Sequence, residues 1–302
     1  MSTGYFYADW RQGGSVPGRM SSLPGGALTV LDWLMLQGPS PWTKTVLGTN
    51  IASYTAPGGS QISLYVDHVY GPPSWMNGRI RGTVGGQTFP TPAQEAASGS
   101  VQFQLASQAT AGSNYYYAWY GVRTDRMVLL FGNGSPAATT ASTFILAGDM
   151  PVYDPADPGL CVVMGSNRVT PYPSNIPSSN NSMFVASTGF SSSIGCGYAY
   201  QSKTGGVFSS GAELRTPILH NSTPSLVSYG SVPLMPVTIM TGSVLRGWMP
   251  FLYPMNVSGL MFNIGGVAQG DTFNAGSATF EAFRIHDTFN WAWMTNDAES
   301  LP

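Results

Sequence analysis

The sequence predicts a mainly β protein, made of antiparallel, sandwich-like domains with one short buried helix. Two observations predict this fold class. Short segments alternate between apolar and polar residues along most of the chain, and Gly, Pro, Asn and Ser separate them. A single segment, near residues 27–37, instead repeats its apolar residues at helical spacing. At 302 residues the chain is long enough for two domains. We expect an N-terminal β domain with the helix over 1–155 and a C-terminal β domain over 156–302.

The helical segment is ALTVLDWLMLQGP, residues 27–39. Its apolar residues cover most of the helix surface and leave Thr29 and Asp32 as a narrow polar stripe. Gly38 can adopt the left-handed conformation that ends a helix, and Pro39 cannot continue it. Apolar helix faces are usually core, so packing across a sheet is favoured over a partner-binding helix.

The clearest strand is VQFQLAS, where Val101, Phe103 and Leu105 share one face. The polar RTDR turn predicts a β-hairpin over residues 115–131. Further strands are predicted at residues 61–67, 115–122, 126–132, 143–148, 160–165, 197–203, 237–248, 260–266 and 278–287. Prolines and asparagines predict an extended loop over residues 166–181.

Charged residues make up 9% of the chain, against about 25% in a typical soluble domain. The hydrophobic content is an ordinary 43%, so Gly, Ser, Thr, Asn and Pro replace the missing charge. Lys44 and Lys203 are the two lysines. Such a surface lacks much of the electrostatic protection against association, so we expect other polypeptides to cover it.

The net charge is −2, and the twelve basic residues are scattered rather than gathered in a stripe, so we expect no direct nucleic-acid binding. No apolar run reaches the roughly 18 residues that a membrane span needs. The start, MSTGYFYADWRQGG, has no apolar run typical of a secretory signal. We therefore expect a cytoplasmic site of synthesis, where Cys161 and Cys196 are buried thiols rather than a disulfide.

The sequence indicates no catalytic residue, no cofactor and no metal site. His68, His220 and His286 lie far apart and outside any zinc-binding spacing. The chain contains no GxSxG, Walker or GxGxxG motif. Cys161 lies in an apolar strand, as an inert thiol does.

An acidic cluster is the exception that needs an explanation. GDMPVYDPADPG, residues 148–159, holds Asp149, Asp154 and Asp157 in a chain with fourteen acids. Asp-Pro steps favour turns in which the Asp side chain bonds local amides, so a structural connector is favoured. An ion-binding or catalytic site remains the alternative, because sequence spacing does not reveal carboxylates that face each other across a cleft.

Aromatic residues crowd the segment YYYAWY. Alternation places Tyr115, Tyr117 and Trp119 on one face and Tyr116 and Tyr120 on the other. One face is core, and the other is too apolar for water alone. A second sheet, another domain or another subunit should therefore lie over it.

Over most of its length the chain resembles a family of largely uncharacterised virion structural proteins from the tail or neck gene clusters of tailed bacteriophages. The resemblance rests on LPGGALTVLDWLMLQG (23–38), Trp42-Thr43-Lys44, Gly48-Thr49-Asn50 with Tyr54, LYVD (64–67), RIRG (79–82), Phe89-Pro90, WYGVRTDRMVLLFG (119–132), Gly148-Asp149, residues 157–161, RGWMPFLY (246–253) and GDTF (270–273). It implies that the Gly-Asp segment opens a second strand-rich domain. No catalytic residue is established in such proteins, so it implies none here.

The expected function is a non-enzymatic structural subunit of a tailed-phage virion, in the tail, baseplate or neck. Its partners would be other virion proteins and copies of itself, assembled in the host cytoplasm. The first alternative is a tail protein that binds host-surface glycan through aromatic residues and the 166–181 loop. The second is a cell-wall hydrolase that uses Asp149, Asp154 or Asp157.

Overall fold

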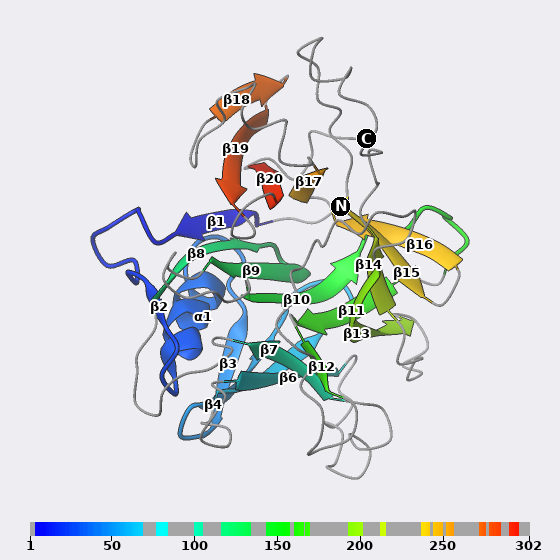
Figure 1. The fold of residues 1–302 in the computed structure, drawn as a ribbon. Helices are drawn as coiled ribbons and strands as arrows, with labels where there is room; N and C mark the ends of the chain where they lie inside the picture. The colour runs from blue at the N-terminus through cyan, green and yellow to red at the C-terminus, as the bar shows by residue number, and fades with distance from the viewer. Residues whose placement is uncertain are drawn as a thin grey trace.

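The computed structural model confirms a mainly β chain with antiparallel sheets, and one helix among the residues it describes (Figure 1). The described residues are 4–68, 77–83, 100–104, 116–133, 143–157, 160–165, 167–169, 193–201, 212–215, 237–241, 244–249, 252–256, 272–275, 278–284 and 290–295. The helix is α1 (Gly26–Leu36). The strands are β1 (Phe6–Asp9), β2 (Met20–Ser21), β3 (Thr43–Gly48), β4 (Ile51–Thr55), β5 (Ser63–Asp67), β6 (Asn77–Thr83), β7 (Ser100–Gln104), β8 (Tyr116–Arg123), β9 (Met127–Asn133), β10 (Thr143–Met150), β11 (Leu160–Gly165), β12 (Asn167–Val169), β13 (Ser193–Gln201), β14 (Ala212–Arg215), β15 (Val237–Thr241), β16 (Val244–Met249), β17 (Leu252–Asn256), β18 (Thr272–Ala275), β19 (Ala278–Arg284) and β20 (Asn290–Thr295).

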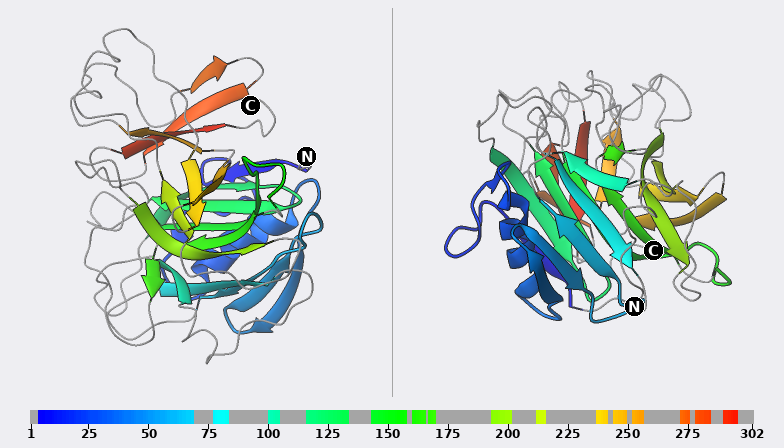
Figure 2. Two further views of the ribbon diagram at one scale, coloured as in Figure 1. Left: turned by 90° about the vertical axis from the view of Figure 1, so that its right-hand side faces the viewer. Right: turned by 90° about the horizontal axis from the view of Figure 1, so that it is seen from below.

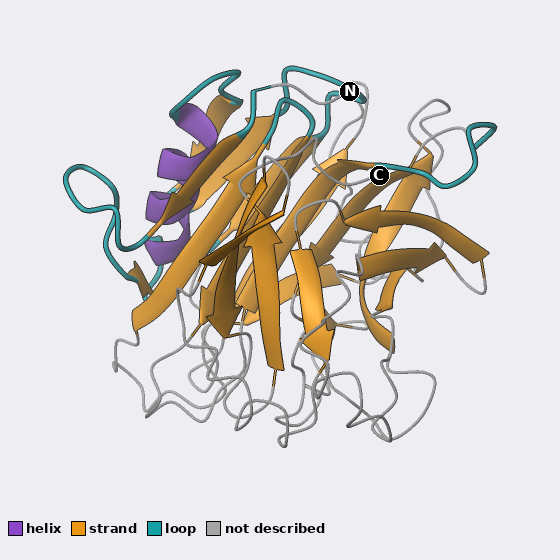
Figure 3. Cartoon of the chain, turned by 90° about the horizontal axis from the view of Figure 1, so that it is seen from above, coloured by secondary structure: helices purple, strands orange, loops and turns teal. Residues whose placement is uncertain are grey.

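These strands form three sheets. The ten-stranded sheet has the order β1-β8-β9-β10-β11-β13-β14-β15-β16, with β2 also paired to β8. The six-stranded sheet has the order β12-β7-β6-β5-β4-β3, and the four-stranded sheet the order β17-β20-β19-β18. Figures 1 and 2 show the ten-stranded sheet in the middle, with the six-stranded sheet on one side and the four-stranded sheet on the other. The helix runs beside the strands (Figure 3) and contacts β1, β2, β3, β4 and β8.

Strands β8–β11 of the ten-stranded sheet are largely apolar, and most of their described side chains are buried on both faces. In β9, Val128 and Leu130 belong to the core shared with α1 and the six-stranded sheet. Leu129 and Phe131 point to the opposite face because strand side chains alternate, and both are fully buried. The four-stranded sheet lies on that side, where Phe280 of β19 is also fully buried (Figure 1). Both faces of β9 are therefore covered within one chain.

The aromatic strand β8 follows the same rule. Tyr117 and Trp119 are buried in the core, as the alternation predicts. Tyr120, on the opposite face, is 2% exposed, whereas Tyr116 at the beginning of the strand is 49% exposed. The prediction that a further layer covers the second face is confirmed for Tyr120, and this layer comes from the same chain.

Several strand predictions correspond closely to observed strands, among them β5, β8, β9, β10 and β11. The segment 237–248 forms two strands, β15 and β16, which pair with each other. The predicted strand at 260–266 lies outside the described residues, as does the 166–181 loop except for β12. The expected boundary near residue 155 falls between β10 and β11, which pair in one sheet. The division into two domains stays a prediction. No helix in the described ranges is long and apolar enough to cross a membrane.

A histidine directly after β5 accepts a hydrogen bond from the first turn of α1. The helix follows Gly25, which has a φ of 84° and offers no side-chain cap. The N–H of Ala27 donates instead to Nδ1 of His68, 3.1 Å away, and the N–H of Gly25 donates to the His68 carbonyl. Burial lowers the pKa of His68 to about 4, although a hydrogen bond with the backbone of Ser22 opposes the shift. The imidazole ring is therefore neutral at pH 7, so Nδ1 can accept the hydrogen bond from Ala27.

A buried arginine satisfies the end of α1. Arg123, at the end of β8, has no exposed surface, and its guanidinium donates to four carbonyls where the helix ends. The acceptors are the carbonyl oxygens of Leu34, Gln37, Pro39 and Ser40. The last carbonyls of a helix lack helical partners and carry its negative dipole end, so a cation is favourable there. Burial lowers the pKa of Arg123 to about 10, which still leaves it charged at pH 7.

We expect Arg123→Lys to destabilise the protein by about 2–4 kcal/mol, because an ammonium cannot reach all four carbonyls and the rest are left buried without donors. Urea unfolding at neutral pH measures the change. The matched control is Arg19→Lys at an exposed position, which should stay within about 0.5 kcal/mol of the wild type. Equal effects of the two exchanges would contradict this role for Arg123.

Acidification should destabilise the chain through His68. The folded-state pKa of about 4 lies below the ordinary value of 6.5, so the unfolded chain binds the proton more readily. The stabilisation is complete above pH 6.5 and is lost as the pH falls towards 4, in total by about 3 kcal/mol. His68→Asn keeps an acceptor near the position of Nδ1 but does not titrate. Unfolding free energies of both proteins across this pH range should therefore diverge, and parallel curves would refute the assignment.

Candidate functional site

The first acid of the 148–159 cluster joins two sheets. Asp149, in β10, accepts hydrogen bonds from the N–H and the hydroxyl of Ser60, at 2.6 and 2.5 Å. Ser60 lies between β4 and β5, so this carboxylate ties the ten-stranded sheet to the six-stranded sheet. The approach is so close that a Cβ on Gly59 would lie 2.0 Å from the Asp149 carboxylate, and Gly59 has a φ of 58°. A glycine is therefore required opposite this acid.

The other two acids have different partners. Asp154 accepts from the N–H of Ala156, a local turn of the kind that Asp-Pro steps favour. Asp157 accepts from Nε and Nη2 of Arg246 in β16, at 2.8 and 2.6 Å, and both side chains of this bidentate pair are nearly buried.

The backbone of the same segment covers the outer edge of β16. Val152 forms a bridge with Gly247, the N–H of Tyr153 donates to the Arg246 carbonyl, and the N–H of Trp248 donates to the Pro151 carbonyl. The strands from β10 to β16 thus curve round, so that residues 151–153, which follow β10, lie against β16, the last strand of the sheet. No group of three His, Cys, Asp or Glu residues suited to a metal ion occurs in the described part. The contacts favour the connector interpretation over the ion-binding or catalytic one.

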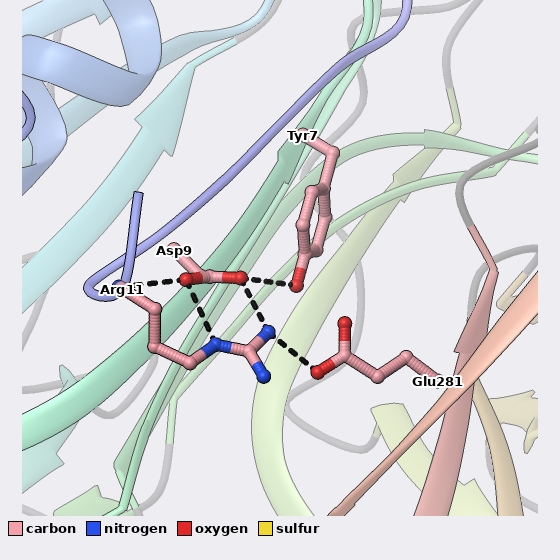
Figure 4. A network of polar contacts seen from close by, with 4 residues as sticks. All are labelled: Tyr7, Asp9, Arg11 and Glu281. Atoms are coloured by element: carbon pink, nitrogen blue, oxygen red, sulfur yellow. Dashed lines mark hydrogen bonds and ion pairs between the residues drawn. The ribbon is translucent and has the colours of Figure 1, made fainter. Parts of the chain in front are cut away.

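A second polar cluster, which sequence reasoning missed, joins the two ends of the described chain. Tyr7, Asp9 and Arg11 come from β1 and the turn after it, and Glu281 comes from β19 (Figure 4). Asp9 accepts four hydrogen bonds, from the Tyr7 hydroxyl and from the backbone N–H, Nε and Nη2 of Arg11. Arg11 Nη2 also lies 2.5 Å from the Glu281 carboxylate. We call these four residues the terminal clamp.

The two carboxyl groups of the terminal clamp titrate differently. Burial would raise the pKa of Asp9, but the hydrogen bonds from Arg11 and Tyr7 lower it below its ordinary value. Burial raises the pKa of Glu281, and Arg11 offsets this only in part. Two carboxylates with separated pKa values can serve as an acid and base pair. Here, however, Asp9 is 3% exposed and its oxygens are occupied, so the arrangement suits a clamp and not catalysis.

The remaining candidates from the sequence are structural or lie outside the described side chains. His68 caps α1, and His220 and His286 are outside the described residues. Cys161 is a free, fully buried thiol, and burial together with the charge of Asp149 raises its pKa well above the ordinary value. Such a thiol is a poor nucleophile. The side chain of Cys196 is outside the described part.

Exposed apolar side chains form the most distinctive surface feature. Val46 and Leu47, at the end of β3, are 70% and 47% exposed. Val244 and Leu245, at the beginning of β16, are 58% and 49% exposed, and Tyr153 beside this strand is 47% exposed. These side chains lie on or next to strands at the edges of the two large sheets.

Comparison with known proteins adds no relative: no family model, no curated protein and no solved structure matches the chain. The functional argument therefore depends on the geometry of this chain itself. The terminal clamp had no sequence signal, because its acids lie at opposite ends of the chain and in no motif. Val46 and Leu47 lie in no predicted strand, and Val244 and Leu245 lie in the predicted strand 237–248. Their position at sheet edges could not be predicted, since the sequence does not say which strand ends a sheet.

In the terminal clamp, Glu281→Gln should leave the protein at least as stable as the wild type at pH 7. The pKa of Glu281 is raised in the folded state. Its contribution to the stability of the fold is therefore present at low pH and is lost as the pH rises through that pKa. Glutamine keeps an acceptor for Arg11 without the second negative charge. The advantage should shrink as the pH falls towards 4.5, which urea unfolding at both pH values measures.

Asp9→Asn is the matched comparison for Glu281→Gln. The pKa of Asp9 is lowered on folding, so its charged form stabilises the fold. Asp9→Asn should therefore lower the free energy of unfolding by about 1–3 kcal/mol at pH 7, because charge-assisted hydrogen bonds are lost. If Glu281→Gln destabilised the protein as much as Asp9→Asn, the inference that the two acids have unequal roles would be wrong.

Proposed function

We propose that the chain is a non-enzymatic structural subunit of a tailed-phage virion, in the tail, baseplate or neck. It would act by assembling with other virion proteins and with copies of itself in the host cytoplasm. The observation that carries the proposal is the combination of 9% charged residues with large exposed apolar side chains at sheet edges. Surfaces of this kind favour burial against other polypeptides.

The use of the charged residues supports the same role. Asp149, Asp157 and Arg246 tie strands together, and the terminal clamp and Arg123 hold segments of the chain in place. In the described part, these seven charged side chains are therefore engaged in internal contacts. In rings and other rotationally symmetric particles one chain is used many times, so a weakly charged surface is buried against its neighbours.

The test is to find the chain in purified virions. Particles are washed at high salt and analysed by quantitative mass spectrometry, and the gene is then inactivated in the phage. The chain should be present in several copies per particle, and its loss should leave particles without a complete tail or neck. Complete, infectious particles without the chain would refute the proposal.

Binding of a host-surface glycan is a second candidate, and one aromatic pair favours it. The rings of Tyr153 and Trp248 lie 4.8 Å apart between centroids, tilted by 40°, and Tyr153 is half exposed. Exposed aromatic faces of this kind offer an apolar surface with a polar tip for stacking. Under this alternative the isolated chain binds host cells, whereas a purely structural subunit does not. The wall-hydrolase alternative has no comparable support, because Asp149, Asp154 and Asp157 hold separate structural partners.

A further inference from the structure

The outer strands of the described sheets differ in how well their edges are protected. An exposed edge offers unpaired N–H and C=O groups, and proteins usually protect it with short strands, charges, proline or a covering segment. Residues 151–153 cover β16. β12 and β18 have three and four residues, and β17 contains Pro254. β1 has four residues and carries the charged Asp9 of the terminal clamp.

β3 is less protected than these strands. It has six residues, five of them exposed, and no described strand pairs with its outer edge. Its charged residue, Lys44, is held by Asp32 of α1 at 2.7 Å, so the charge is neutralised beside the helix. A register shift between Val46 and Gly48 marks a bulge near the end of the strand, which leaves residues 43–46 as a regular pairing stretch.

We propose that the edge of β3 pairs with β3 of a second copy of this chain. A two-fold axis at Thr45 would set the two strands antiparallel, with each Thr45 opposite the same residue of the other copy and each Val46 opposite Lys44. It would join two six-stranded sheets into one. Main-chain hydrogen bonds would supply much of the binding, as in strand addition generally. This inference rests on the proposed function and names the surface through which copies assemble.

The chemistry of the edge favours a second copy as the occupant. In a two-fold interface the same residues face each other, so any free charge on the strand would meet its own sign. In β3 the ion pair between Lys44 and Asp32 removes this repulsion between the two copies. Val46, the most exposed of the large apolar side chains in the described part, then packs against the methylene groups of Lys44 in the facing strand, whose ammonium is held by Asp32.

The first test is sedimentation of the full chain over a wide range of concentration. The wild type should dimerise, and Val46→Lys should weaken dimerisation at least about tenfold, since it places a second positive charge opposite Lys44 of the facing strand. Val244→Lys is the matched control, because Val244 is similarly exposed on an edge strand that residues 151–153 partly cover. A wild type that stays monomeric, or equal weakening by both lysines, overturns the proposal.

A second measurement does not depend on the lysine variants. Thr45→Cys should form a disulfide-linked dimer under mild oxidation, because facing residues near the axis have Cβ atoms about 4.5–5.5 Å apart. Val244→Cys should not, and circular dichroism checks that both variants are folded. Equal cross-linking of the two variants contradicts the pairing.

The outcomes separate this inference from the proposed function. If virions contain the chain but Val46→Lys dimerises like the wild type, the β3 pairing is wrong and the structural role stands. If the β3 dimer forms but complete virions lack the chain, the proposed function is wrong and the pairing stands.

Discussion

Strands β8–β11 of the ten-stranded sheet impose one requirement on the rest of the chain: both of their faces are apolar, so both must be kept from water. The hydrophobic effect favours covering such a surface, and layered sheets and helices are the usual way to do it. On one side the six-stranded sheet and α1 cover Val128 and Leu130. On the other side lies the four-stranded sheet with its buried Phe280. Covering a sheet with a helix leaves polar helix ends in the interior, and His68 and Arg123 bind these ends.

The scarce charged residues are used mainly as links between elements. Asp149 joins two sheets, Asp157 and Arg246 fix the segment that covers β16, and Arg11 connects β1 to β19. Buried ion pairs add little net stability, because desolvation offsets much of their attraction, but removing one partner is costly. In this chain these charged contacts determine which segments lie against each other. Charges engaged in this way do not help to keep the surface apart from other proteins.

The sequence was sufficient for features that depend on local pattern. Alternation placed the strands β5 and β8–β11, and helical spacing with Gly38 and Pro39 predicted α1; Gly38 has the expected left-handed φ of 71°. Features that depend on long-range pairing could not be predicted. Periodicity carries no information on strand order, so neither the protected edge of β16 nor the open edge of β3 could be foreseen. The terminal clamp joins residues from opposite ends of the chain, and no local pattern marks them.

The terminal clamp also has a consequence for synthesis. β1 leaves the ribosome before its described pairing partner β8 and well before β19, whose Glu281 contacts Arg11. Contacts between residues so distant in sequence form slowly, and chains generally fold from the N-terminus as they emerge. β1 must therefore wait for β8 before it can pair, and for β19 before the terminal clamp is complete. A chain interrupted before β19 leaves Asp9 and Arg11 without Glu281, so this corner of the fold forms only after β19 has been made.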